Sequence, residues 1–220
     1  MNTLERRTNL GTVEFRAEGG VLRAGGYAAK FNTNSQNLGG FVERIAPGAF
    51  AKTLKEADIR ALFNHDPNFV LGRNRAGTLR MEEDATGLAY EFDLPDTSLG
   101  RDLAVSLERG DISGSSFGFR AIEDEWSETE DGFPLRTLKS NALRDVGPVT
   151  FPAYTDATSS LRSLAESRNL DLDALILASQ EDRLKEMLAA RSEDKNLQDD
   201  VGEDDRATPI IRPRFRHLAR

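Results

Sequence analysis

Turn-forming glycines recur at short intervals through residues 1–160, and this punctuation constrains the fold more than any other feature. The glycine-containing turn signals are Gly19-Gly20, Gly25-Gly26, Gly39-Gly40, Gly77, Gly87 and Asp131-Gly132. Between them lie short runs with strand-like composition, at residues 13–17, 21–31, 77–81, 88–94, 117–126 and 135–143. Glycine after aspartate is typical of a tight hairpin, because glycine tolerates the positive φ that such a turn needs. Many short strands with close turns predict a mainly β protein, an antiparallel barrel or sandwich.

Two helices are expected to interrupt these strands. Residues 47–55 start with Pro47, which suits the first turn of a helix, and have apolar residues four apart. Residues 99–109 follow the tripeptide 96–98, which offers capping side chains, and Gly110 ends the run. The predicted fold class is therefore mainly β (α+β).

The composition changes after the β region, so we divide the chain into three parts. Residues 1–160 are the β domain. Residues 161–192 are an amphipathic helical segment, in which apolar residues at helical spacing predict one helix or two short ones over 170–191. Residues 193–220 combine an acidic run with an arginine-rich end. This tail has too few apolar groups to fold by itself, and we expect it to be disordered.

The chain has no cysteine and two histidines, His65 and His217, among its 220 residues. The absence of cysteine excludes disulfides, a thiolate nucleophile and cysteine-ligated metals. Two histidines cannot build a three-histidine metal site. A carboxylate site for magnesium or calcium stays possible, but no acidic loop of the EF-hand kind is present. We therefore expect no metal and no cofactor.

The overall charge and hydrophobicity narrow the range of partners. The formal net charge is −8, from Lys+Arg 29 against Asp+Glu 37, which weakly disfavours a nucleic-acid surface. No stretch approaches the roughly 20 apolar residues that a membrane-spanning helix needs. Residues 1–7 are charged and lead into polar sequence, so we expect no secretory signal and a cytoplasmic location.

His65 is the first residue that could carry chemistry. An apolar run leads into it and Pro67 breaks the strand just after it, which predicts a histidine at a strand end. Reactive groups are often held in such places by a rigid scaffold. Taken alone, however, a lone surface or half-buried histidine is the commoner explanation.

A glycine-flanked pair of serines and a later aspartate are the other candidates. Ser115 and Ser116 lie between Gly114 and the strand Phe117-Gly118-Phe119, and glycine beside a nucleophile lets a substrate carbonyl come close. Read alone, this run is an ordinary turn. Asp145 follows a strand, where a lone aspartate is usually a turn residue. A serine nucleophile nevertheless needs a base, and the base needs a group that orients it.

Several ordered blocks resemble the prohead maturation proteases of tailed bacteriophages, which are related to the herpesvirus assemblin proteases. The blocks are residues 41–50, 63–66, 71–73, 87–88, 109–112, 116–119, 145–146 and 152–154. Each block is weak alone, but their order and spacing together are specific. The resemblance covers roughly residues 10–160.

This resemblance implies a serine endopeptidase with an antiparallel β-barrel of the herpesvirus-protease type and surrounding helices. The family pattern implies Ser116 as nucleophile and His65 as general base. Herpesvirus relatives use a second histidine as the third member, and phage relatives usually have an acidic residue, which corresponds to Asp145 here. Ser115 stands beside the nucleophile and could confuse a mutational test. Arg73 and Arg144 could assist at the oxyanion, although a surface or structural role is the commoner one for such arginines.

The resemblance also implies partners and a location. Such proteases act in the host bacterial cytoplasm inside the immature capsid. There they cut the scaffolding segment of the major capsid protein or a separate scaffold protein, and often themselves. Self-association is possible, and no nucleic acid or membrane is expected. The region 160–220 would then be an incorporation segment removed by self-cleavage, or equally a dispensable tail.

Two other functions stay open at this point. One is a non-catalytic structural component of the capsid or scaffold with the same fold. The second is a histidine-dependent nuclease, suggested by Asn64-His65-Asp66, although such sites normally need further metal ligands. A metal-dependent protease meets the same objection.

Overall fold

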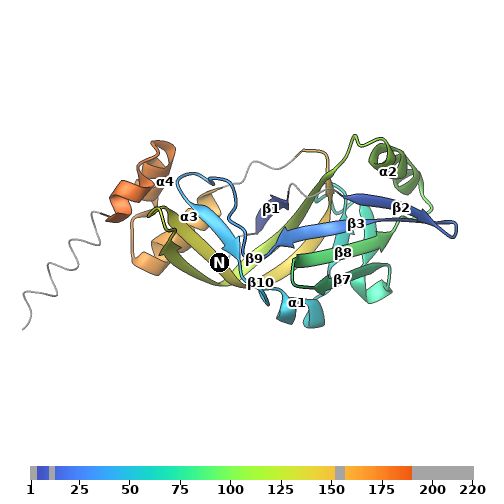
Figure 1. The fold of residues 1–220 in the computed structure, drawn as a ribbon, viewed down its shortest axis with the longest axis horizontal. Helices are drawn as coiled ribbons and strands as arrows, with labels where there is room; N and C mark the ends of the chain where they lie inside the picture. The colour runs from blue at the N-terminus through green and yellow to red at the C-terminus, as the bar shows by residue number, and fades with distance from the viewer. Residues whose placement is uncertain (1–3, 10–12, 152–156, 190–220) are drawn as a thin grey trace, which may run out of the picture. The chain divides into compact units, whose positions relative to one another are not determined.

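The computed structural model describes residues 4–9, 13–151 and 157–189. The chain divides into two units, residues 1–185 and 186–220, and the description that follows concerns the first. The tail predicted over 193–220 lies outside the described residues, as does the block 152–154. Figure 1 shows the order of the strands and helices along the chain.

A six-stranded sheet carries the candidate residues. Its strands run in the order β1-β9-β10-β5-β6, and β4 also pairs with β10. Their bounds are β1 (Glu5–Asn9), β4 (Val42–Ile45), β5 (Arg60–Leu62), β6 (Val70–Arg73), β9 (Gly114–Glu128) and β10 (Pro134–Val149). β9 and β10 form a long antiparallel hairpin whose turn contains Gly132 at φ 67°, which confirms the predicted Asp-Gly turn.

A second sheet is fully antiparallel and has four strands in the order β2-β3-β8-β7. Their bounds are β2 (Glu14–Glu18), β3 (Val21–Lys30), β7 (Leu79–Glu83) and β8 (Gly87–Asp93). β3 and β8 lie side by side in Figure 1, with β7 next to β8. All four strands match runs predicted from the sequence.

The mainly β, α+β class is confirmed, but the expected antiparallel barrel is not what the described strands form. Neither sheet closes on itself, and β1 and β6 are left as edges of the larger one. That sheet is also mixed, because β4 and β5 pair parallel to β10. The reason is the length of β10, whose 16 residues pair with β9 along one side and with β4 and then β5 along the other.

The first two helices support the sheets from outside. α1 spans Ala51–Glu56, four residues later than the predicted start, because Gly48 has φ 85° and cannot belong to a right-handed helix. α2 spans Ser98–Glu108 as predicted, and the Thr97 side chain accepts a bond from Gly100 N. A 3-10 turn, η1, spans Asn74–Ala76.

Further helices follow the β region, and helical backbone recurs at residues 184–189. α3 spans Ala157–Arg168 and overlaps the segment 161–192 that was expected to be helical, although helical spacing was identified only over 170–191. α4 spans Leu172–Gln180 within the predicted helical segment 170–191, and Asp171 caps its first turn. It ends before Asp182, whose φ of 56° breaks the helix. Within the described part of the chain, no helix is long and apolar enough to span a membrane.

One hydrophobic core joins the two sheets. Phe92 from the smaller sheet and Phe117, Phe119 and Val146 from the larger one are buried in it. Phe50, just before α1, packs edge-on against Phe117 at 5.6 Å between ring centroids. This packing fixes β9 and β10, which bear the candidate serine and aspartate, as a rigid platform.

Candidate active site

Ser116 lies in the middle of the larger sheet, near the start of β9. It faces Gly147 on β10 and Thr8 on β1. Successive side chains of a strand point to opposite faces, so Ser116 and Gly118 share one face while Phe117 and Phe119 project to the other. Those two rings stack at 5.0 Å between centroids and hold the strand in the core.

His65 is held by a tight turn that follows β5. Both Asn64 and His65 have left-handed backbones, with φ 54° and 58°. Such conformations are uncommon for non-glycine residues and cost of order 1 kcal/mol or more. They therefore persist only where contacts with neighbouring residues hold the backbone in place. Here the Asn64 side chain supplies the contacts: its Oδ1 accepts from Thr150 N at 2.8 Å and its Nδ2 donates to Thr150 Oγ1 at 3.1 Å. The His65 turn is thereby tied to the end of β10.

Asp145 lies on β10 beside Gly118 of β9. Its side chain is 4% exposed, and one carboxylate oxygen, Oδ1, makes a short hydrogen bond with His65 Nδ1. A methyl group on Gly118 would place its carbon 2.7 Å from Asp145 Oδ2. The glycine of the Phe-Gly-Phe sequence therefore leaves the space that the carboxylate occupies.

The three side chains form a continuous series. His65 Nε2 lies 2.7 Å from Ser116 Oγ, while its Nδ1 faces Asp145. A carboxylate only accepts hydrogen bonds, so it selects the imidazole tautomer that carries its proton on Nδ1. Nε2 is then free to accept the proton of Ser116. The chemistry available to this arrangement is activation of a serine hydroxyl by general base.

The structure separates the two neighbouring serines. Ser115 is on the opposite face of β9 and donates a hydrogen bond to the Tyr90 hydroxyl at 2.9 Å. Both groups are buried, and burial raises the pKa of Tyr90 despite the bond from Ser115. Ser115 is thus a structural residue and does not contact His65 in the described hydrogen bonds.

Strand β1 covers Ser116, a feature that the sequence analysis missed. The Ser116 side chain is fully buried, and Ser116 Oγ lies 2.9 Å from the backbone carbonyl oxygen of Arg7. A hydroxyl has one proton to donate, so the Arg7 carbonyl competes with His65 Nε2 for it. Any peptide that reaches Ser116 must therefore take the place of this part of β1.

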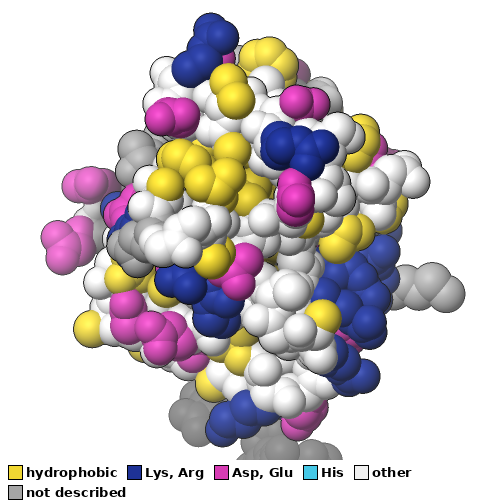
Figure 2. Space-filling view, turned by 90° about the vertical axis from the view of Figure 1, so that its right-hand side faces the viewer, with side chains coloured by type: hydrophobic (Ala, Val, Ile, Leu, Met, Phe, Trp, Pro, Cys, Tyr) yellow, Lys and Arg dark blue, Asp and Glu magenta, His cyan; other side chains and the backbone are white. Residues whose placement is uncertain are grey.

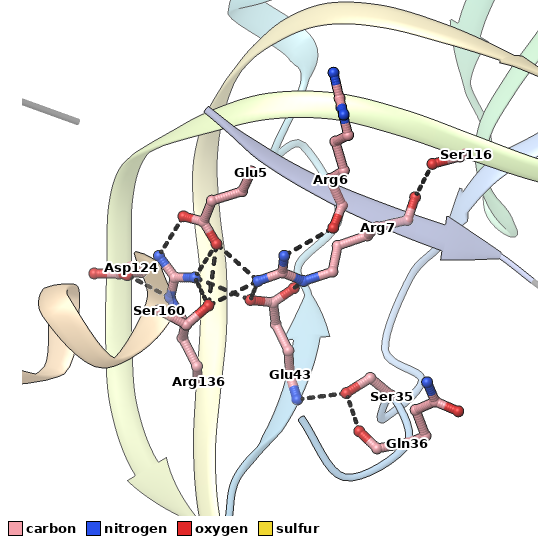
Figure 3. A network of polar contacts seen from close by, with 10 residues as sticks. All are labelled: Glu5, Arg6, Arg7, Ser35, Gln36, Glu43, Ser116, Asp124, Arg136 and Ser160. Atoms are coloured by element: carbon pink, nitrogen blue, oxygen red, sulfur yellow. Dashed lines mark hydrogen bonds and ion pairs between the residues drawn. The ribbon is translucent and has the colours of Figure 1, made fainter. Parts of the chain in front are cut away.

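A buried network of charges holds β1 in place (Figure 3). Arg7 Nε and Nη2 bind the two carboxylate oxygens of Glu43 at 2.8 and 3.0 Å. Arg136 Nη1 and Nη2 bind the two oxygens of Glu5 at 2.8 and 3.2 Å. Ser160, on α3, accepts from Arg7 at 2.8 Å and from Arg136 at 3.0 Å. The network thus links β1 to β4, β10 and α3.

The pKa values of Glu5 and Arg136 are set by the ion pairs that each makes in this network. Burial alone would raise the pKa of Glu5, but its hydrogen bonds to Arg136 and Arg7 and their charges outweigh burial and hold its pKa below 4.5. The carboxylates of Glu43 and Glu5 likewise raise the pKa of Arg136 against the effect of burial. Glu5 and Arg136 therefore stay charged near neutral pH, although Arg136 is entirely buried.

The remaining predicted residues lie elsewhere. Arg73 Nε and Nη2 bind Asp58 at 2.7 and 2.6 Å, and hydrogen bonds from Arg73 lower the pKa of Asp58 to about 2. Arg144 is exposed on β10. Among the described residues no three carboxylate or imidazole groups gather where a metal ion could bind. His65 is hidden as well: its side chain is 6% exposed, and Figure 2 shows no histidine on the face that it draws.

Comparison with known proteins places this arrangement in a family. The family profile described as the caudovirus prohead serine protease matches residues 9–169. The chain belongs to this family. The match contains Ser116, His65 and Asp145, and it begins at the last residue of β1.

Two known proteins are similar to this chain. The prohead protease of Enterobacteria phage HK97 is 30% identical over 148 residues, which are 66% of this chain. The aligned part is 62% of the HK97 protein, so this chain spans less than two thirds of that relative. The capsid assembly protease gp21 of bacteriophage T4 has a TM-score of 0.47 and 15% identity, over 68% of this chain and 98% of that one.

Proposed function

We propose that this chain is a serine endopeptidase of phage head maturation, with Ser116 as nucleophile, His65 as general base and Asp145 as the residue that orients the base. The observation that carries the proposal is the unbroken series from Ser116 Oγ through His65 to the Asp145 carboxylate. Membership of the caudovirus prohead serine protease family supports the same chemistry.

The reaction follows from these contacts. Ser116 Oγ bonds to the carbonyl carbon of the scissile peptide while His65 Nε2 takes its proton. The imidazolium then gives this proton to the amide nitrogen, the C–N bond breaks, and the new amino terminus leaves. Water attacks the remaining ester with the same histidine as base, which releases the acid product and restores Ser116. Asp145 holds the imidazole in place and its carboxylate stabilises the imidazolium.

The proposed substrates are capsid and scaffold chains. The protein would act in the bacterial cytoplasm within the immature capsid, on the scaffolding segment of the major capsid protein or on a separate scaffold protein, and on itself. Self-association in the capsid is part of the proposal. The names of the two similar proteins, a prohead protease and a capsid assembly protease, support a role in head assembly.

The enzyme is preferred to a non-catalytic structural component. A protein with only a structural role has no need of a serine, an imidazole and a carboxylate in hydrogen-bonded series within a buried site. The nuclease proposal lacks support in the described residues, where no cluster of metal ligands lies near His65.

Co-expression with the capsid protein of the same phage tests the proposal. Intact protein should produce a capsid-protein fragment, and Ser116→Ala should produce none. Ser115→Ala is the matched control, since Ser115 is equally buried but bonds to Tyr90, and this variant should still cleave. Cleavage by a folded Ser116→Ala protein would contradict the assignment of the nucleophile.

A further inference from the structure

The position of β1 shows how a peptide chain lies beside the nucleophile. β1 pairs antiparallel with β9, and Thr8 stands opposite Ser116. The backbone carbonyl that Ser116 Oγ contacts is that of Arg7, at 2.9 Å. A substrate attacked by Ser116 must bring its carbonyl carbon within reach of Ser116 Oγ, so a substrate strand would follow the path of β1 closely, with a small shift from carbonyl oxygen to carbonyl carbon. The bond between Arg7 and Thr8 therefore marks the register of the scissile bond in a bound substrate.

The Arg7 side chain marks where the residue before that bond would bind. It leaves the sheet on the face opposite the Ser116 side chain, because Arg7 pairs with Phe117. Its guanidinium lies 5.5 Å from the centroid of the Phe119 ring and binds both oxygens of Glu43. Figure 3 shows the Arg7 carbonyl directed to Ser116 and its guanidinium directed to Glu43. Glu43, Phe119 and Ser160 lie on β4, β9 and α3, so this pocket is lined by elements other than β1.

Glu5 marks a second position, two residues earlier. Its carboxylate binds Arg136 through two nitrogens, and Arg136 is fully buried. Arg136 is fixed from its other side by Asp124, at 2.6 Å from its Nε. Glu43 thus faces the Arg7 side chain and Arg136 faces the Glu5 side chain. The two positions adjoin, because Arg136 Nη1 also binds Glu43 Oε2 at 3.0 Å and Arg7 Nη2 binds Glu5 Oε2 at 2.7 Å.

We propose that Glu43 and Phe119 form the binding site for a basic substrate residue immediately before the scissile bond. Arg136 binds an acidic substrate residue that stands two positions before this basic residue. The inference rests on the proposed function, since it assigns substrate specificity to the same site. Paired hydrogen bonds between ionised groups in a buried pocket discriminate, because a neutral side chain in the bound strand removes one charged partner from Glu43 or Arg136, although these two still bind each other and Arg136 still binds Asp124. The family match begins at residue 9, so most of β1 precedes it, whereas Glu43, Phe119 and Arg136 lie within it.

Cleavage of short peptides by the full-length protein tests the inference without altering the enzyme. The reference substrate is an internally quenched peptide with the sequence of residues 4–9, Leu-Glu-Arg-Arg-Thr-Asn. Matched peptides carry Arg7→Leu, Arg7→Glu or Glu5→Gln. We expect cleavage between Arg7 and Thr8, and a value of kcat/KM lowered at least about tenfold by each substitution. Equal or faster cleavage of the Arg7→Leu or Arg7→Glu peptide would overturn the inference.

Substitutions of Glu43 in the enzyme test the inference independently of changes in the peptide. Glu43→Gln should reduce the preference for the reference peptide over the Arg7→Leu peptide, and Glu43→Asp should restore part of it. A preference unchanged by Glu43→Gln in a folded protein contradicts the role of Glu43. Because the preference is a ratio within one protein sample, partial loss of active enzyme does not alter it.

Casein digestion separates failure of the inference from failure of the proposed function. New carboxyl termini in casein fragments should be arginine or lysine, with acidic residues enriched two positions earlier. If cleavage requires Ser116 but occurs after residues other than arginine or lysine, the proposed specificity is refuted and the proposed protease function stands. If the intact protein cleaves neither casein nor any of the peptides, the proposed function is contradicted and the specificity falls with it.

Discussion

The carboxylate of Asp145 lies directly against the backbone of Gly118, two residues beyond Ser116 on β9. A side-chain methyl at Gly118 would place its carbon 2.7 Å from Asp145 Oδ2 and 3.3 Å from Oδ1. The first distance is well inside van der Waals contact, so a side chain at this position must push the carboxylate away from His65. Gly118 is therefore part of the geometry of the site.

Substitution Gly118→Ala should leave a folded but poorly active protein. A displacement of about 1 Å at a catalytic group can lower the rate roughly 100-fold, and we expect a loss of that order in kcat. Gly114→Ala is the control on the same strand, where the methyl carbon would lie 3.3 Å from Val149 atoms. Cleavage rates and thermal unfolding of both variants check this. Full activity of Gly118→Ala would show that Asp145 need not stay in place.

Substitution Asp145→Asn should abolish most activity while preserving the packing of β10. The amide can donate a hydrogen bond to Nδ1, which favours the wrong imidazole tautomer, and kcat should fall by roughly 10⁴-fold. Asp66→Asn is the control, because Asp66 lies next to His65 but its carboxylate bonds to Asn68. If Asp145→Asn lowers kcat by less than tenfold, Asp145 does not have the proposed role of orienting His65. Steady-state cleavage at saturating peptide measures kcat, and single-turnover cleavage measures the chemical step separately.

Substitution Asn64→Ala should weaken the hold on His65. It removes both side-chain bonds to Thr150 and leaves a non-glycine residue at φ 54° without compensation. We expect kcat to fall about 10- to 100-fold with little change in the thermal midpoint. Asn64→Gly separates the two effects, because it relieves the backbone strain but not the loss of the bonds. If Asn64→Gly restores full activity, the bonds to Thr150 are not required.

The ion pairs of Glu5 should make stability depend on pH in the acidic range. Its pKa is below 4.5 in the folded protein, so the unfolded chain binds the proton more readily. The stabilisation is fully present above the ordinary pKa and is lost as the pH falls through the lower, folded value. The free energy of unfolding should decline as the pH falls below about 4.5, and less steeply in Glu5→Gln.

Urea unfolding at several pH values measures this dependence. Glu14→Gln is the matched control, because Glu14 pairs with Arg16 on the surface with a side chain that is 57% exposed. Exposed pairs contribute little to stability, so this variant should follow the profile of the unaltered protein. Identical slopes for Glu5→Gln and the unaltered protein would mean that Glu5 has an ordinary pKa.

The sequence predicted the elements that local signals define. The hairpin of β9 and β10 depends on a turn at Gly132, and α2 depends on a cap at Thr97, so neighbouring residues suffice to identify both. Local signals failed where backbone geometry overrode them, as at Gly48, whose positive φ delays the start of α1.

Strand β1 could not be predicted because its burial depends on partners far along the chain. The segment Glu-Arg-Arg-Thr-Asn has the composition of an exposed loop. Arg7 is nevertheless buried, because it bonds to Glu43 and Ser160, which are 36 and 153 residues away. A charged segment becomes a buried strand only when the tertiary structure supplies opposite charges, and no local pattern encodes them.

The same distinction applies to the candidate site. The sequence alone identified Ser116, His65 and Asp145 as residues of the right chemical types in blocks typical of a family. Only the tertiary structure brought together His65 and its partners, which are 51 and 80 residues away. It also decided that β1 covers Ser116, that Gly118 leaves space for Asp145, and that the sheets stay open. Strand pairing and side-chain contacts across such separations are determined by long-range packing. Turns and helix caps, by contrast, are determined by residues that are neighbours in the sequence.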